Sequence, residues 1–300
     1  MKYPSTQAAP ALPQSSIEEI SLRYSSRGMT ILRQYLREDY CRHTAKRLLS
    51  LPRGSVLLTT GFYVAGVAET DGPPGTLCLA AALKKLGFSP TIVTDHICRN
   101  LFEMERIPVT YVDVADGRLT YETLLQRYKP VALISVERCG RNRKNDYANM
   151  RDVSIAKETA SIDTLFELAA DRDILTIGIG DGGNEIGMGN LKDVIARQLS
   201  LTPCTITVDE LIVATTSNWG AYALAACMEH FSGKPLLPAY QEIADFLKRI
   251  VSLGCVDGVT KKQEPTVDGF SPDVEEEIFQ ALLNVAKKSG IASPGQRRTS

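Results

Sequence analysis

The chain has 300 residues, of which 44% are hydrophobic and 23% are charged, and its formal net charge is -1. This composition is typical of a globular protein with a sizeable core. A nearly neutral chain lacks the excess positive charge that displaces counterions from nucleic acid. It also contains no run of about 18 or more apolar residues, so nothing in it predicts a membrane span.

The seven cysteines are odd in number, widely spaced and never in C-x-x-C spacing. This pattern predicts reduced thiols in a reducing compartment, which is the cytoplasm, or the mitochondrial matrix for a eukaryotic protein. Residues 1–24 are rich in Pro, Ser and Ala and have no apolar signal core, so they are predicted to form a flexible arm. Residues 291–300 are predicted to be a loose tail. A single domain is expected between them, over 25–290.

Along this domain, helical periodicity alternates with short apolar runs. The first helix is expected from Arg27 to about Pro52. The apolar runs predict strands over 55–60, 91–94, 109–114, 131–136, 174–177 and 210–214. Helices are predicted from about 96 through Arg106, through 191–199, and over 76–86, 121–128, 162–170, 221–231, 240–253 and 272–288.

The predicted strands are apolar throughout, as expected for parallel strands that are covered on both faces. The pattern therefore indicates a doubly wound α/β fold, with a mainly parallel, six-stranded, Rossmann-like sheet and helices on both faces. In such a sheet the carboxyl ends of the strands share one edge, and ligands bind there at the switch in strand order. Polar residues that follow the strands are the candidates for a site.

The densest candidate is the glycine-rich loop over 178–189, which follows the fifth predicted strand and carries Asp181, Asn184 and Glu185. These side chains could bind a divalent cation, an ammonium group or a ribose hydroxyl, or they could cap the next helix. The glycine spacing is not G-x-G-x-x-G and no Walker lysine follows, so a dinucleotide or P-loop site is not favoured.

Other strands also end in polar groups. Glu69, Thr70 and Asp71 precede a proline-rich turn, which lacks the amides that a phosphate needs. Glu137 is interpreted as a base or a ligand, and Arg138 as a bidentate partner for a substrate carboxylate, although a structural ion pair is the alternative.

Several of these segments occur together and in a fixed order. They are Arg27-Gly28, Thr60-Gly61-Phe62, 69–75, Glu137-Arg138, Tyr147 with Asn149-Met150-Arg151, Thr159-Ala160, 178–189 and Asn218-Trp219-Gly220. In this order they resemble the C-terminal domain of the D-glutamate cyclase family. The resemblance implies a carbon–oxygen lyase that converts D-glutamate, a small amino-acid substrate, to 5-oxo-D-proline with loss of water.

Cyclisation needs a deprotonated amine, a stabilised oxyanion and a proton for the leaving oxygen. The candidate catalytic residues are Asp71, Glu137, Asp181 and Glu185. The candidate substrate-binding residues are Glu69, Thr70, Arg138, Gly182, Gly183, Asn184 and Asn218, with the amides of Gly182 and Gly183 as oxyanion donors. Asp71, Asp181 and Glu185 are also candidate ligands for a divalent metal, Mg²⁺ or Mn²⁺.

Two other classes of function stay open at this point. One is a non-catalytic module that binds a nucleotide or an amino acid, and the other is a metal-dependent hydrolase of another small substrate. The sequence is compatible with a homo-oligomer but does not specify one.

Overall fold

The computed structural model describes residues 16–288. The predicted tail and residues 1–15 of the predicted arm lie outside this range. Within the arm, Ile17–Ser21 form the short helix α1, which begins with a capping box between Ser16 and Glu19. Ile17 and Ile20 are buried in the core, so the arm boundary predicted at residue 24 falls inside the folded part of the chain.

The core of the fold is one six-stranded sheet with the order β5-β4-β1-β6-β7-β8, in which every pair is parallel. The strands are β1 (Ser55–Thr59), β4 (Ser89–Thr94), β5 (Val109–Tyr111), β6 (Ala132–Val136), β7 (Leu175–Gly180) and β8 (Glu210–Val213). The chain builds outward from β1 to β5, then returns to the other side of β1 and builds outward again. This confirms the doubly wound α/β fold and places the switch in strand order between β1 and β6.

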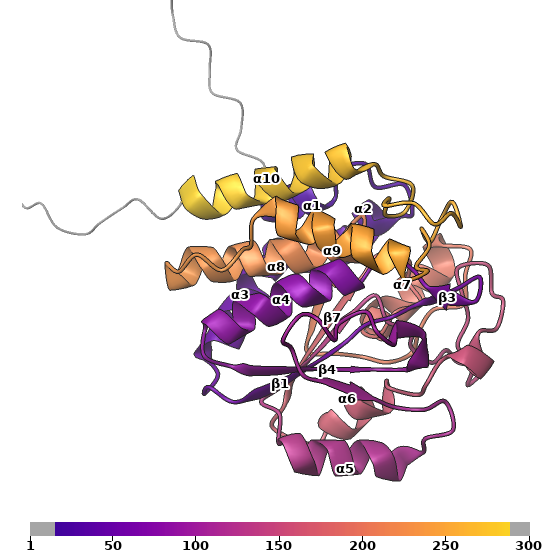
Figure 1. The fold of residues 1–300 in the computed structure, drawn as a ribbon. Coiled ribbons are helices and arrows are strands. Elements are labelled where there is room, and N and C mark those ends of the chain that lie inside the picture. The colour runs from indigo at the N-terminus through magenta and orange to yellow at the C-terminus, as the bar shows by residue number, and fades with distance from the viewer. Residues whose placement is uncertain (1–15, 289–300) are drawn as a thin grey trace, which may run out of the picture.

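Helices cover both faces of the sheet (Figure 1). They are α2 (Met29–Leu32), α3 (Tyr40–Ser50), α4 (Pro73–Lys85), α5 (Arg118–Tyr128), α6 (Thr164–Ala169), α7 (Lys192–Gln198), α8 (Ser217–Ser232), α9 (Tyr240–Ser252) and α10 (Pro272–Lys288). Helices α3, α4 and α8 lie on one face, while α5 and α6 lie on the other.

Helix α8 lies between two layers, because α1 and α10 pack on it from outside and α9 packs on α4 and α10. Every residue from 217 to 228 is buried. A helix that is apolar on all sides needs such a position, and its amino end is held against the carboxyl edge of the sheet. Within residues 16–288, none of the helices combines the length and the apolar character needed to cross a membrane.

Two local predictions were wrong, and one element was not predicted. The first predicted helix is divided into α2, a 3-10 turn over Arg33–Tyr35 and α3. The helix expected through Arg106 is only a 3-10 turn, His96–Cys98. An antiparallel hairpin of β2 (Tyr63–Val64) and β3 (Val67–Ala68) occupies the loop after β1.

Long segments gather at the carboxyl edge of the sheet. The segment over 254–271 folds back onto the residues that precede α4, because the amide of Thr70 donates to the carbonyl of Val256 (2.9 Å). The loop after β6 bridges to the glycine-rich loop after β7 at Cys139 and Glu185. Together with the β2–β3 hairpin, these segments enclose a cavity above the switch point.

Candidate active site

The cavity has a volume of about 620 Å³ and lies at the carboxyl ends of the strands. It is lined by parts of the β2–β3 hairpin, of the loop over 149–155 and of the segment over 258–270, together with Ser26 and Arg27. A cleft at this edge of a doubly wound sheet is where a ligand is expected.

Buried carboxyl groups gather at the floor of the cavity. Glu69, Glu137, Glu185 and Asp268 line it, and all four carboxyl groups are almost fully buried. Asp71 and Asp181 lie beside them, and carboxylate oxygens of Asp71, Glu137 and Asp181 lie within 4.8 Å of one another. We call these six residues the acidic cluster. Fully ionised, the cluster would carry more negative charge than the neighbouring side chains neutralise, and burial raises the pKa values of Glu69, Glu137 and Asp181 well above their usual range.

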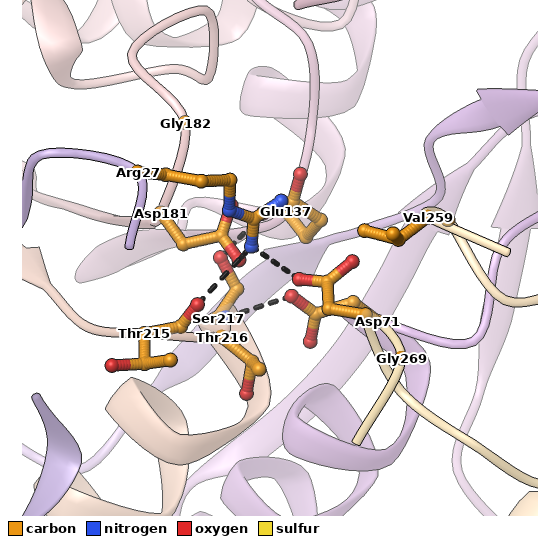
Figure 2. Close-up of polar contacts among 12 residues, drawn as sticks. Arg27, Asp71, Glu137, Asp181, Gly182, Thr215, Thr216, Ser217, Val259 and Gly269 are labelled. Carbon is orange, nitrogen blue, oxygen red and sulfur yellow. Dashed lines mark hydrogen bonds and ion pairs between the residues drawn. The ribbon is translucent and has the colours of Figure 1, made fainter. Parts of the chain in front are cut away.

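Arg27 is the cation at the centre of this cluster (Figure 2). Its Nη2 donates to the carboxylates of Asp181 and Asp268 and to the carbonyl oxygen of Thr215, which lies 3.1 Å away. Among residues 16–288, its Nη1 has one hydrogen-bond contact, with the sulfur of Met150 at 3.6 Å. The side chain is 20% exposed. The guanidinium therefore keeps donors that a ligand in the cavity can use.

Glu137 directly follows β6 and has a φ of +48°, a left-handed conformation that is rare outside glycine. Strained backbone of this kind is concentrated at functional sites. The hydroxyl of Ser217, at the start of α8, donates to its carboxylate over 2.5 Å. Burial, followed by the charges of Glu185 and Asp71, raises the pKa of Glu137 well above its usual range. The site thus favours the protonated acid.

Asp71 has a structural task as well as a place in the cluster. Its carboxylate accepts from the amides of Ser217 and Asn218, both at 2.8 Å, and from that of Gly72 at 3.0 Å, so it caps α8. In return, the Oδ1 of Asn218 accepts from Gly72 (3.0 Å) and Gly75 (2.8 Å), at the start of α4. Burial and the charge of Asp268 raise the pKa of Asp71 to about 7.

The predicted oxyanion donors are not available. The amides of Gly182 and Gly183 both donate to the carboxylate of Glu185, each at 2.7 Å. The glycine-rich loop therefore holds its own acid, and the prediction for these two amides is corrected. Asn184 lines the cavity and its Nδ2 donates to the carbonyl of Ala148 (2.8 Å). Its buried Oδ1 has no hydrogen-bond partner within residues 16–288.

Arg138 does not face the cavity. Its side chain is fully buried and forms an ion pair with Asp95 at 2.5 Å. It also donates to the carbonyls of Gly61 (2.9 Å) and Ala160 (2.8 Å). The prediction that Arg138 binds a substrate carboxylate is therefore corrected, because its donors are used to tie together the loops after β1, β4 and β6.

Thr70 and Asn218 are likewise structural. The hydroxyl of Thr70 donates to the carbonyl of Thr266 (2.7 Å), and Asn218 caps α4. Sequence reasoning missed Arg27, Ser217 and Asp268 as site residues. Arg27 belongs to one of the segments that carry the family resemblance, and Ser217 directly precedes another. Asp268 lies in a turn-rich segment whose position depends on the tertiary fold.

Comparison with known proteins identifies the family of this chain. A family model described as "D-glutamate cyclase-like, C-terminal" matches residues 18–283, a range that contains the whole acidic cluster and Arg27. Human mitochondrial D-glutamate cyclase is 35% identical over 210 residues, which covers 61% of this chain and 34% of the human protein. The chain thus spans about a third of the length of this relative.

Proposed function

The chain belongs to the D-glutamate cyclase-like family, and on this basis we propose that it is a carbon–oxygen lyase that converts D-glutamate to 5-oxo-D-proline with loss of water. The observation that carries the proposal is the acidic cluster around Arg27, which faces a cavity at the switch point of the sheet. Such a cluster supplies what cyclisation needs, namely groups that bind an ammonium, a cation for a carboxylate and acids with raised pKa values.

Recognition of the substrate follows from the charges. The ammonium group of glutamate binds among the carboxylates of the floor, where the excess negative charge attracts it. The side-chain carboxyl binds Nη1 of Arg27, whose charge also stabilises the tetrahedral oxyanion. Lys261 and Arg151 line the cavity near its mouth and supply positive charge for the α-carboxylate.

Proton transfer is assigned to two acids with different surroundings. Burial raises the pKa of Glu185, and the hydrogen bonds from Gly182 and Gly183 offset part of this rise. Its ionised form is therefore a stronger base than an exposed carboxylate, and it takes a proton from the ammonium group. Glu137 is favoured in its protonated form by burial and by its acidic neighbours. As the α-nitrogen bonds to the side-chain carboxyl carbon it loses two protons overall, one to Glu185 and one that restores the proton of Glu137. The leaving oxygen receives two protons, one from Glu137 and one from Glu185, and departs as water when its bond to that carbon breaks.

As an alternative to the role of Glu137 as an acid, Asp71, Glu137 and Asp181 fit a divalent cation, Mg²⁺ or Mn²⁺, which would keep all three carboxylates ionised. The fit rests on three buried carboxylates from different loops, whose oxygens lie within 4.8 Å of one another, and hard cations prefer such oxygen ligands. When bound, the ion would polarise the side-chain carboxyl of the substrate as a Lewis acid. The metal ligands predicted from the sequence were Asp71, Asp181 and Glu185, but the carboxylate of Glu185 accepts from two amides of its own loop.

The test is to incubate the purified chain with D- or L-glutamate, with EDTA or with Mg²⁺ or Mn²⁺, and to follow 5-oxoproline by mass spectrometry. We expect product from the D isomer. A dependence on the divalent ion would assign it to the acidic cluster, and Asp181→Asn should then weaken the dependence. If folded protein yields no product from either isomer, the cyclase proposal fails and a small-ligand-binding module becomes the better account.

A further inference from the structure

The apolar residues at the mouth of the cavity, which we call its apolar wall, are exposed, whereas the acidic residues at its floor are buried. The acidic floor residue Glu185 is only 1% exposed, whereas Met150, Val153 and Val259 are 37%, 57% and 53% exposed and line the mouth of the same cavity. Figure 2 shows Val259 beside the acidic cluster. Large apolar side chains that are exposed together around a cleft mark a surface that binds an apolar group.

The size of the cavity also favours a ligand that carries an apolar group. A volume of about 620 Å³ falls in the range for drug-sized ligands, roughly 300–1,000 Å³. Glutamate is much smaller than such ligands, and its apolar surface is limited to two side-chain methylene groups. A glutamate molecule on the floor therefore leaves the apolar mouth unused.

The charge balance disfavours free glutamate further. The ionisable side chains that line the cavity are four acids, Glu69, Glu137, Glu185 and Asp268, and three bases, Arg27, Arg151 and Lys261. Asp71 and Asp181 are two further acids close by, and each of these acids that is ionised repels an anionic ligand. Free glutamate is an anion, whereas an amide of its side-chain carboxyl is a neutral zwitterion. The amide meets less repulsion at this site.

We propose that the preferred substrate is a γ-glutamyl amide of D configuration whose side-chain carbonyl is joined to an apolar amine, and that cyclisation releases this amine with 5-oxoproline. The inference rests on the proposed cyclase function and names the substrate class of the same site. The glutamyl part binds the acidic floor and Arg27, and the apolar amine binds Met150, Val153 and Val259.

The reaction balances without water or a redox partner. The α-nitrogen forms a bond to the γ-carbonyl carbon, and the bond between that carbon and the leaving nitrogen breaks. The ammonium nitrogen loses two protons overall. The leaving nitrogen takes one of them as the bond breaks and, where the released amine is basic, takes the other to become an ammonium ion. Glu185 and Glu137 carry these protons, as in the cyclisation of glutamate.

The experiment compares three substrates of D configuration by steady-state kinetics, with 5-oxoproline measured by mass spectrometry. They are the γ-anilide of glutamate, glutamine and glutamate. Glutamine has the same net charge as the anilide but lacks its apolar ring, so this pair isolates the apolar wall. We expect kcat/KM for the anilide to exceed that for glutamine by about tenfold or more, the discrimination typical of an apolar pocket.

Variants of the apolar residues at the mouth of the cavity test whether these residues cause the preference for the anilide over glutamine. Val153→Ser and Val259→Ser should each lower the ratio of kcat/KM between anilide and glutamine about three- to tenfold, because each removes apolar contact. Leu253→Ser is the matched control, since Leu253 is 51% exposed and is not among the residues that line the cavity. Thermal unfolding by circular dichroism checks that all three variants are folded.

The outcomes separate this inference from the proposed function. Turnover of D-glutamate with no preference for the anilide over glutamine would overturn the inference and leave the cyclase function intact. No turnover of any substrate would overturn both. Turnover of the anilide without that of D-glutamate would support the inference and replace loss of water by loss of an amine.

Discussion

Two arginines lie at the same edge of the sheet, and their surroundings are opposite. Arg138 and Asp95 are both fully buried and form a pair of one cation and one anion, and backbone carbonyls take further donors of the arginine. Arg27 contacts two carboxylates, those of Asp181 and Asp268. Further members of the acidic cluster surround it, and one edge of its guanidinium faces a cavity.

The difference separates structural charge from functional charge. A buried pair that is neutral as a unit and hydrogen-bonded on most sides needs no ligand, and removal of one partner leaves the other charge buried. A cluster with excess negative charge next to a cavity favours the arrival of another cation or of protons. The predictions below test this contrast between the Arg138 pair and the Arg27 cluster, beginning with the largest expected effect.

Replacement of the structural arginine should damage the fold most. Arg138→Met leaves the carboxylate of Asp95 buried and without its cation, so we expect the free energy of unfolding to fall by about 3–5 kcal/mol. Urea unfolding, followed by circular dichroism, measures the change. The control is Arg143→Met at an exposed position, with an expected change within about 0.5 kcal/mol. Equal losses for both variants would contradict the structural role.

Replacement of Arg27, which lines the cavity, should lower the activity more than the stability. Arg27→Met removes the proposed carboxylate and oxyanion partner, so turnover of D-glutamate should fall about 100-fold, which corresponds to roughly 2.7 kcal/mol of transition-state stabilisation. Stability should fall less than in Arg138→Met, because the carboxyl groups beside the cavity can take up protons. An inactive Arg138→Met that is fully stable, together with an active but unstable Arg27→Met, would reverse the comparison.

The contrast also shows how much of the fold and of the site could be predicted from the sequence. Six strands with continuous apolar runs were enough to predict the doubly wound sheet, because a parallel sheet covered on both faces has this pattern. The same rule correctly placed Glu69, Glu137, Asn184 and Glu185 at the cavity. Helix ends and the β2–β3 hairpin were predicted poorly, since two-residue strands carry no periodicity.

Sequence position could not separate Arg138 from Arg27. Whether a guanidinium is satisfied depends on groups that are far away in the chain, such as the carbonyls of Gly61 and Ala160 for Arg138. The same holds for the amides of Gly182 and Gly183. Their capture by Glu185 depends on the curvature of the loop, which residue types alone do not specify.

A third prediction concerns pH. Burial and the charge of Asp268 raise the pKa of Asp71 to about 7, so the folded state favours the protonated acid. The stabilisation from this group is fully present below the unfolded pKa and is lost as pH rises through the folded pKa of about 7. Between about pH 5 and pH 8 we therefore expect the free energy of unfolding to fall by about 2–3 kcal/mol from this source, most of it below pH 7.

Asp268→Asn tests the origin of this pH dependence. It removes the second cause of the shift, after burial, while the amides that cap α8 through Asp71 keep their acceptor. Urea unfolding across this pH range should then give a shallower slope than in the wild type. A slope that is unchanged in Asp268→Asn would show that burial alone sets the pKa, and that the acidic cluster is less tightly coupled than its geometry indicates.

The smallest expected effect concerns the scaffold that holds the cluster. Pro73 and Pro74 have no amide hydrogen, so the free donors at the start of α4 are those of Gly72 and Gly75, and Asn218 accepts from both. Asn218→Ala should lower the free energy of unfolding by about 1 kcal/mol, as loss of a helix cap does. Urea unfolding measures this loss, and Asn284→Ala on the exposed side of α10 serves as its control.

The functional result of Asn218→Ala sharpens the comparison of the two arginines. Asp71 and Asn218 cap each other's helices, so a loosened α4 displaces Asp71 relative to Glu137 and Asp181 while it leaves the Arg138 pair untouched. The apparent affinity for Mn²⁺, measured by titration calorimetry, should therefore weaken in Asn218→Ala and not in Asn284→Ala. Equal affinities in these two variants would mean that the cation binds through the other carboxylates and that Asp71 serves only as a cap.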